Sequence, residues 1–276
     1  MRFCITVSLL FLLSVNTVCA LDGDVDGGSE NIFFKANQFY FNGEFEKAVQ
    51  LYESILKNHQ SNLIFQSESR GELFYNIGNC YFRSGQKGNA LLNYERARRF
   101  IPRDADLKYN IEYVHDLTED NLSQPENIIS EIFGVNFFSQ TELATVFCLV
   151  NLMLFLFLTI RIFFRAEWIF YVIIIFSICW IVSGISFGIM LKQTIFDDRV
   201  VILAKEVDVL AGPDKEDTLL FKVHEGTLAY QERNESGFSL IRLPDSKRGW
   251  LVSSAIEAIY MAGAIQKQEL EGAKLE

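Results

Sequence analysis

The sequence predicts a multidomain membrane protein: an all-α helical repeat domain, a transmembrane helical hairpin and a small all-β barrel, in that order. Three observations indicate this fold class. Two apolar runs, 143–160 and 168–191, contain no charged residue. A glycine-centred motif occurs twice before Pro102. From Val200 onward the hydrophobic period changes from that of a helix to that of short strands.

Composition agrees with this class. The chain has 276 residues, of which 50% are hydrophobic, and its formal net charge is −10. The charge is concentrated in two acidic flanks around an apolar centre. Because phosphates require a basic surface, we expect no nucleic-acid partner.

The first twenty residues have the pattern of an export signal. Arg2 is followed by the apolar stretch Ile5–Val15, and Val18 and Ala20 are the short side chains that suit a cut after Ala20. We therefore expect residues 1–20 to be a cleaved signal peptide. A lipid-modified Cys19 and an uncleaved N-terminal anchor are the alternatives.

Residues 21–28 are predicted to be a flexible acidic leader. Asp22, Asp24 and Asp26, followed by Gly27, copy the first half of a calcium-binding loop. A complete loop needs a bidentate glutamate six residues after that glycine, and Phe33 occupies this position. We expect no metal site here.

Residues 29–118 contain an internal repeat of two helix–turn–helix units. Gly43 and Gly85 stand at the turns, 42 positions apart, and each is followed at equal distances by an alanine and a tyrosine (Ala48 and Tyr52, Ala90 and Tyr94). This pattern resembles the tetratricopeptide repeat, although the usual spacing in that family is 34 residues and Lys87 replaces a usual aromatic. Asp104–Leu117 is predicted to be the helix that caps a short solenoid.

The resemblance implies a concave groove lined by the first helix of each pair. It places on that surface Phe33, Phe34, Asn37, Tyr40, Tyr75, Asn76, Asn79, Phe82, Tyr109, Asn110 and Tyr113. Amide side chains can pair with the donor and the acceptor of an extended peptide backbone, and aromatic rings can hold its side chains. The alternative is that the asparagines are solvated and that the aromatics pack on a neighbouring segment.

Four arginines close the second repeat: Arg96, Arg98, Arg99 and Arg103. Cations are favoured near the C-terminus of a helix by its dipole. We interpret these arginines as a solvated helix end.

Residues 119–140 are predicted to be a linker, followed by transmembrane helices at 141–164 and 168–191. Each apolar run is long enough to cross a hydrocarbon core of ~30 Å. Arg161 and Arg165 lie at the short connection, whose centre is residues 165–167, so the positive-inside rule places it in the cytoplasm. Both flanking domains then lie on the outer side, in agreement with an export signal.

Residues 198–260 are predicted to be a small barrel of six short strands. The strands are 200–204, 207–210, 219–223, 228–231, 238–243 and 249–252, with a turn at Ser253–Ile256. The segments around Gly212-Pro213 and Gly249-Trp250 resemble a bacterial SH3 domain, which implies Tyr230 and Phe238 as ligand contacts and Trp250 as core. The tail, 261–276, is predicted to fray.

The chain shows no sign of catalytic chemistry. Its three histidines are far from any cluster with metal-ligand spacing, and no nucleophile elbow or phosphate-binding loop occurs. After removal of the signal peptide, Cys80 is the single cysteine in an exported region, so neither a disulfide nor a dithiol is expected there. We predict a non-enzymatic protein without cofactors.

The whole order of parts resembles the BatE-type proteins of the Bacteroides aerotolerance (Bat) operons. The resemblance implies a two-pass protein of the bacterial inner membrane, with the repeats and the SH3-like barrel in the periplasm. It also implies a scaffold for membrane proteins that carry von Willebrand factor A domains, beside a MoxR-type ATPase, in tolerance of oxygen or envelope stress. The alternative is an envelope sensor or a cell-wall protein that binds a peptidoglycan stem through the barrel.

Overall fold

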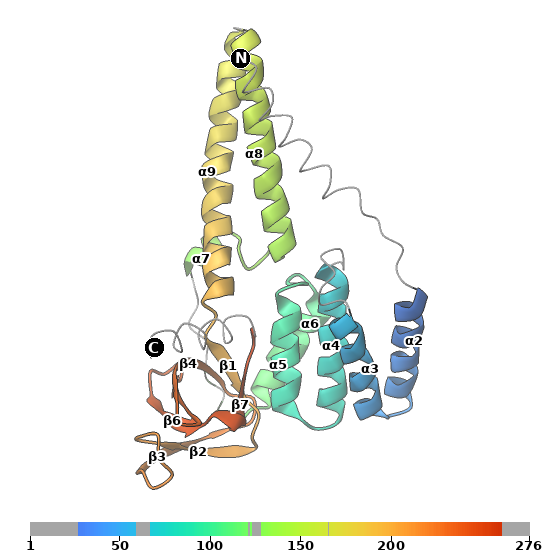
Figure 1. Cartoon of the computed structure of the whole chain (residues 1–276), viewed down its shortest axis with the longest axis vertical. Coiled ribbons are helices and arrows are strands. Elements are labelled where there is room, and N and C mark those ends of the chain that lie inside the picture. Colours follow the sequence, from blue (N-terminus) through green and yellow to red (C-terminus); the bar gives the residue numbers. More distant parts are fainter. Residues whose placement is uncertain (1–26, 59–66, 121, 123–127, 165, 261–276) are drawn as a thin grey trace.

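A computed structural model describes residues 27–58, 67–120, 122, 128–164 and 166–260. The expected signal peptide, the segment 21–26 of the leader, and the tail after Tyr260 lie outside the described residues. Figure 1 shows a helical hairpin that rises from a base, in which a group of helices and a β-sheet lie side by side.

Five helices form the helical array: α2 (Gly27–Phe41), α3 (Phe45–Asn58), α4 (Ser67–Arg83), α5 (Lys87–Arg98) and α6 (Ala105–Asp116). Gly43 and Gly85 make the turns within the two pairs, with φ of 80° and 78°, a region that glycine enters at no steric cost. Asp104 caps α6, because its side chain accepts a hydrogen bond from the backbone nitrogen of Leu107 at 2.7 Å.

The helices of the array pack around two cores. Ala36, Ala48 and Tyr52 of the first pair share one core with Ile77 of α4. The core of the second pair contains Leu91, Tyr94, Leu107 and Val114 and continues into the sheet through Val201, Leu228 and Ile259. The second pair and the sheet therefore share one hydrophobic core.

Beyond the array, a short helix α7 (Ile128–Ile132) precedes two long helices, α8 (Gln140–Phe163) and α9 (Glu167–Ile195). Ser139 and Glu142 form a capping box that starts α8. The ring of Phe147 stacks on Phe187 at 5.3 Å, and that of Phe157 on Phe176 at 5.3 Å, so α8 and α9 pack as an antiparallel hairpin.

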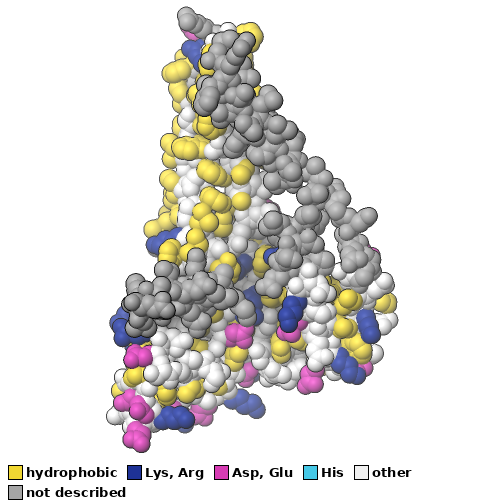
Figure 2. Space-filling model, in the orientation of Figure 1, with side chains coloured by type: hydrophobic (Ala, Val, Ile, Leu, Met, Phe, Trp, Pro, Cys, Tyr) yellow, Lys and Arg dark blue, Asp and Glu magenta, His cyan; other side chains and the backbone are white. Residues whose placement is uncertain are grey.

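The hairpin presents its apolar side chains outward. Its helices have 24 and 29 residues and are long and apolar enough to cross a membrane. Figure 2 shows hydrophobic side chains along its length, with acidic and basic side chains on the base below.

The sheet has seven antiparallel strands in the order β3-β2-β6-β5-β4-β1-β7. They are β1 (Arg199–Ile202), β2 (Glu206–Leu210), β3 (Leu219–His224), β4 (Leu228–Glu235), β5 (Phe238–Arg242), β6 (Arg248–Val252) and β7 (Ile256–Ala258). The sequence predicts six strands and a turn at Ser253–Ile256. In the structure a 3-10 turn, Ser253–Ala255, leads directly into β7, which pairs with β1.

Helix α5 lies against β1 at very close range. A Cβ atom on Gly88 would lie 2.6 Å from the carbonyl oxygen of Ile202 and 3.2 Å from the Cα of Leu203. Real Cβ atoms do not approach a backbone oxygen so closely. Glycine at position 88 therefore sets the distance between the array and the sheet.

Candidate functional site

A hydrogen bond that occurs in both repeats uses two of the predicted groove asparagines. The buried hydroxyl of Tyr52 donates to Oδ1 of Asn37 at 2.5 Å, and that of Tyr94 donates to Oδ1 of Asn79 at 2.8 Å. Burial raises the pKa of both tyrosines, which therefore stay protonated donors. The oxygens of Asn37 and Asn79 hold the second helix of each pair and are not free for a peptide.

A third groove asparagine joins this network from α6. Asn110 Nδ2 donates to the hydroxyl of Tyr75 at 3.0 Å and lies 3.4 Å from Oδ1 of Asn79. Of the four asparagines, Asn76 is half-buried, and its side chain makes no hydrogen bond to any described residue. Asn76 is thus the asparagine whose amide remains available to a ligand.

The aromatic residues of α4 and α6 form a continuous cluster, which we call the aromatic cluster: Phe82, Tyr109 and Tyr113. The rings of Tyr109 and Tyr113 stack at 6.0 Å, and Phe82 meets Tyr113 edge-on at 5.9 Å. Tyr109 and Tyr113 are 64% and 45% exposed. The cluster is an accessible, pre-ordered apolar surface with polar rims.

The predicted groove residues of α2 are used differently. Phe33 packs on Tyr52 at 5.7 Å, and Tyr40 meets the rings of Phe41 and Phe45. Phe34 is exposed. On α2, therefore, Phe33 and Tyr40 are half-buried in contacts within the first pair, and Phe34 is accessible.

The two residues predicted as SH3-like contacts differ in accessibility. Phe238 is only 8% exposed and pairs with Val252 across β5 and β6, so its side chain is part of the interior. A side chain buried to this extent leaves little surface for the ligand contact that the sequence predicts at Phe238. Tyr230 is half-buried beneath the guanidinium of Arg242, at 4.6 Å from the ring centroid.

The arginines that close α5 are not a solvated helix end. The side chains of Arg96 and Arg99 are 13% and 12% exposed, and both contact segments more than 95 residues away. Arg98 and Arg103 are half-exposed and paired with Glu95 and Glu142. The interpretation from helix-dipole electrostatics is wrong because distant carboxylates fold back onto this helix end.

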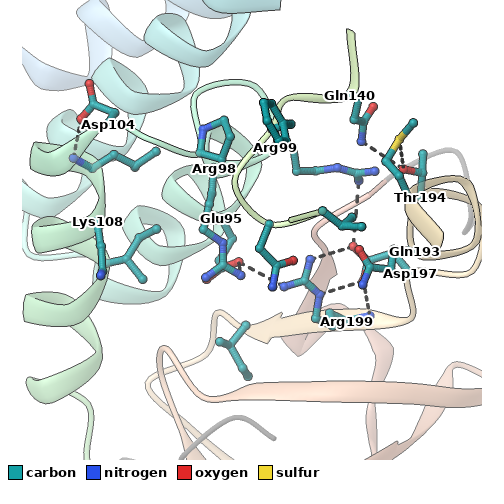
Figure 3. A pocket seen from close by; sticks show the side chains of 18 of the residues that line it. Glu95, Arg98, Arg99, Asp104, Lys108, Gln140, Gln193, Thr194, Asp197 and Arg199 are labelled. Carbon is teal, nitrogen blue, oxygen red and sulfur yellow. Dashed lines mark hydrogen bonds and ion pairs between the residues drawn. The ribbon is translucent and has the colours of Figure 1, made fainter. Parts of the chain in front are cut away.

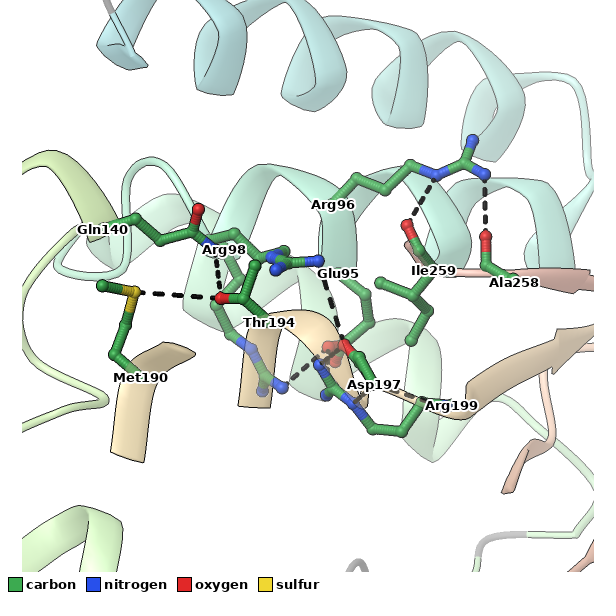
Figure 4. A network of polar contacts seen from close by, with 11 residues as sticks. Glu95, Arg96, Arg98, Gln140, Met190, Thr194, Asp197, Arg199, Ala258 and Ile259 are labelled. Carbon is green, nitrogen blue, oxygen red and sulfur yellow. Dashed lines mark hydrogen bonds and ion pairs between the residues drawn. The ribbon is translucent and has the colours of Figure 1, made fainter. Parts of the chain in front are cut away.

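Alternating charges connect α5 to the start of the sheet, as Figures 3 and 4 show. Glu95, 2% exposed, accepts from Arg98 at 2.7 Å and from Arg199 at 3.2 Å. Arg199 also holds both carboxylate oxygens of Asp197 at 2.9 Å, and Asp197 lies 3.9 Å from Arg99. A bidentate arginine pair is geometrically specific, so this chain fixes the foot of α9 against α5.

The environment of this charge chain favours the ionised forms of Asp197 and Arg199. Burial acts to raise the pKa of Asp197, but hydrogen bonds from Arg199 and the charges of Arg199 and Arg99 bring it below its ordinary value. Burial acts to lower the pKa of Arg199, and the bonds and charges of Asp197 and Glu95 raise it instead. Burial lowers the pKa of Arg99.

A cavity of about 950 Å³ lies where the array, the hairpin foot and the sheet meet. We call it the junction cavity. Figure 3 shows charged side chains of both signs around it. Its lining includes Arg98, Lys108, Asp198, Arg199 and Tyr230. A cavity with both cationic and anionic walls suits a zwitterionic or amphiphilic ligand better than a simple anion.

Arg96 fastens the edge of the sheet to α5. Figure 4 shows its guanidinium directed at the backbone after β7. It donates to the carbonyl oxygens of Ala258 (2.9 Å) and Ile259 (3.2 Å) and pairs with Glu257 at 2.7 Å. These bonds cover part of an edge strand, which would otherwise expose free backbone groups.

A second polar contact ties the end of α6 to the sheet. The carboxylate of Asp120 accepts from the backbone nitrogen of His224 at 2.7 Å and from Thr227 at 2.8 Å, and it lies 3.1 Å from Nδ1 of His224. Glu225 accepts from the backbone nitrogen of Gly88 at 2.9 Å. The turn between β3 and β4 is therefore anchored to both α5 and the segment after α6.

Within the described ranges, no group of three or more His, Cys, Asp or Glu side chains is arranged to hold a metal ion. In comparisons with known proteins, no protein-family model and no curated protein matches the chain.

Proposed function

We propose that the chain is a non-enzymatic membrane scaffold that offers the aromatic cluster to a protein partner. The single observation that carries this proposal is the stack of Tyr109 and Tyr113 beside Phe82. These residues lie on helices that share one core with the sheet. Aromatic residues are enriched at protein interfaces because they supply a large contact area with little entropy to lose.

The two helix pairs with their shared asparagine–tyrosine bond support assignment of the array to the tetratricopeptide type. The short bent strands support an SH3-like domain. On this proposal α8 and α9 cross the bacterial inner membrane, and the array and the sheet lie together in the periplasm.

Partner binding then differs in detail from the sequence prediction. Asn37, Asn79 and Asn110 hold the array together, and the partner meets the aromatic cluster and the amide of Asn76. On the basis of the resemblance to Bat-type proteins, we propose membrane proteins with von Willebrand factor A domains as the partners.

The test is recovery of partners from native membranes in mild detergent with a tagged chain. We expect wild type to recover von Willebrand-type membrane proteins in stoichiometric amount, and a Tyr109→Ala, Tyr113→Ala variant to lose them. Phe41→Ala is the matched control, because Phe41 is 83% exposed outside the aromatic cluster. Equal recovery by all three chains would remove the aromatic cluster as the binding surface.

The junction cavity favours one alternative, an envelope protein that binds a peptidoglycan stem. A stem peptide carries amino and carboxylate groups, and the cavity presents both signs of charge beside Tyr230. Calorimetry with muropeptides and the purified full chain would detect it. Binding that is lost in Tyr230→Ala would favour this function, and no heat at millimolar muropeptide would exclude it.

A further inference from the structure

The segment between the array and the hairpin, which the sequence predicts to be a linker, climbs along α9. We call residues 128–139 the hook. Ser130 Oγ accepts from Gln193 Nε2 at 2.6 Å, and three residues later the carbonyl oxygen of Phe133 accepts from Ser186 Oγ at 3.2 Å. Seven residues of helix separate these partners, which corresponds to a rise of about 10 Å.

The hook then returns to the foot of the hairpin. The side-chain amide of Gln140 hydrogen-bonds Thr194 Oγ1 at 3.1 Å, at the start of α8. Between the two ends, Val135 packs with Leu143 and Met190. The path is therefore up along α9 and back down, within twelve residues.

The top of the hook lies at a depth that the hairpin itself defines. Ser186 is five residues inside the apolar run that ends at Leu191, or about 8 Å. That run of 24 residues is about 36 Å long, against a hydrocarbon core of ~30 Å, so a centred membrane begins about 3 Å inside each end. Phe133 is thus about 5 Å inside the hydrocarbon core, near the level of Phe147, whose ring stacks on Phe187 toward the foot of the hairpin.

The outer side of the hook is apolar. Ile129, Ile132 and Phe137 are 60%, 74% and 57% exposed. Helical spacing places Glu131 on the opposite side of α7 from the two isoleucines. A water-facing linker would have no reason to expose three large apolar side chains in twelve residues.

The backbone of the hook is also suited to a medium without water. In hydrocarbon, each polar backbone group needs a partner within the protein. Four backbone nitrogens at the top of the hook donate to nearby carbonyl oxygens: Phe133 to Ile129, Gly134 to Glu131, Val135 to Ser130, and Phe137 to Gly134. The carbonyl oxygen of Phe133 is satisfied by Ser186.

At its lower end the hook is held by the array. Arg103 pairs with Glu142, and its guanidinium lies 5.3 Å and 5.9 Å from the ring centroids of Phe137 and Phe138. A cation above two aromatic rings is the arrangement expected at the boundary between headgroups and acyl chains.

From this path, depth and surface we propose that the hook is a third membrane-embedded segment, re-entrant in the leaflet nearest the array. Ile132 and Phe137 contact acyl chains, and Ile129 and Arg103 lie at headgroup level. This inference rests on the proposed placement of the hairpin in a membrane. It gives the array a fixed height above the bilayer, so that the aromatic cluster is presented to other proteins of the same membrane.

The experiment uses the full chain in vesicles of phosphatidylcholine that contain a lipid with a doxyl quencher on its acyl chain. The five native cysteines are replaced, and single cysteines are labelled with bimane at Ile132→Cys or Phe137→Cys. Cys148, retained alone, is the control for lipid contact, because it is exposed on α8 beside Phe147. Leu219→Cys is the control for water, because Leu219 is 48% exposed on the edge strand β3.

We expect quenching at positions 132 and 137 to match that at Cys148, and position 219 to remain bright. Quenching at Cys148 with positions 132 and 137 as bright as 219 would overturn the hook while leaving the hairpin in place. No quenching at Cys148 would instead contradict the membrane placement on which both proposals depend. Because the two substituted side chains are on the surface, these variants test lipid contact and not folding.

Discussion

The hydroxyl of Tyr94 lies 2.8 Å from Oδ1 of Asn79, and the same bond joins Tyr52 to Asn37 exactly one repeat earlier in the chain. Each bond crosses from the second helix of a pair to the first, 15 residues away. The repeat of the sequence is therefore a repeat of a buried polar contact. Asn37 and Asn79 occupy positions that resemble peptide-binding positions. Their hydrogen bonds to the buried tyrosines give them a structural role instead.

This role separates two asparagines that are three positions apart. Asn79→Ala removes the acceptor of a buried hydroxyl, and an unsatisfied buried donor costs about 1–3 kcal/mol. Asn76→Ala removes no bond to a described residue, so we expect it to leave the free energy of unfolding within about 0.5 kcal/mol of wild type. Thermal or denaturant unfolding in detergent, followed by tyrosine fluorescence, measures the difference. Equal stability of the two variants would contradict the structural role of Asn79.

The contact between α5 and β1 predicts the effect of a single added methyl group. Gly88→Ala places a Cβ 2.6 Å from the carbonyl oxygen of Ile202, so α5 must move away from the sheet. We expect a destabilisation of about 1–3 kcal/mol from overpacking, and faster proteolysis between the array and the sheet.

The matched control for this substitution is Gly188→Ala, because a Cβ at position 188 meets no atom within 4 Å. This control substitution in α9 should leave both unfolding and limited proteolysis unchanged. A Gly88→Ala chain as stable and protease-resistant as Gly188→Ala would show that α5 and β1 do not depend on this distance.

Local patterns predict those parts of the fold that local interactions determine. The hairpin helices, the turns at Gly43 and Gly85 and the helix after Pro102 lie where the sequence places them, because apolar runs, glycines and helical periodicity act over a few positions. Trp250 is buried, as expected from the usual burial of tryptophan side chains.

Features that depend on distant partners could not be predicted in this way. Glu95 and Arg199 are 104 residues apart. No short stretch of sequence indicates that Arg99, at the end of α5, lies near Asp197, which follows α9. Strand β7 exists because β1 offers it a partner. Phe238 is 8% exposed, and an alternating pattern alone does not state which face of a strand is covered.

Arg199 connects two buried carboxylates, which predicts a large penalty for its removal. In Arg199→Met, Asp197 loses its closest cation, and Glu95 loses one of the two arginines that it binds. Breaking a buried pair in this way costs about 3 kcal/mol. Arg248→Met is the control, because Arg248 is 61% exposed and its pair with Glu232 is worth ~0–1 kcal/mol. Denaturant unfolding of both variants compares the two losses. A loss for Arg199→Met no larger than that for the control would contradict a stabilising charge chain.

The contact between Asp120 and His224 predicts how stability depends on pH. The hydrogen bond that the ring of His224 donates to Asp120 is the largest cause that raises the pKa of His224 above 6.5, and burial opposes it. Burial acts to raise the pKa of Asp120. Hydrogen bonds from the backbone and ring of His224 and from Thr227 outweigh burial and bring this pKa below 3.8. A raised histidine pKa gives stability that is complete below pH 6.5 and is lost as the pH rises through the folded value. A lowered carboxylate pKa gives stability that is lost as the pH falls below 3.8.

Between these limits the ion pair is fully formed, so we expect the stability difference between wild type and Asp120→Asn to be largest near pH 5.5 and to shrink toward pH ~8.5. Unfolding midpoints of the two chains at both pH values measure it. Repeating the comparison in a His224→Gln background isolates the histidine, because the pH dependence of the difference should then disappear. A difference that stays constant between the two pH values in the native background would mean that His224 gains no charge-dependent bond from Asp120. In that case the three bonds to Asp120 would stabilise the turn between β3 and β4 through neutral hydrogen bonding alone.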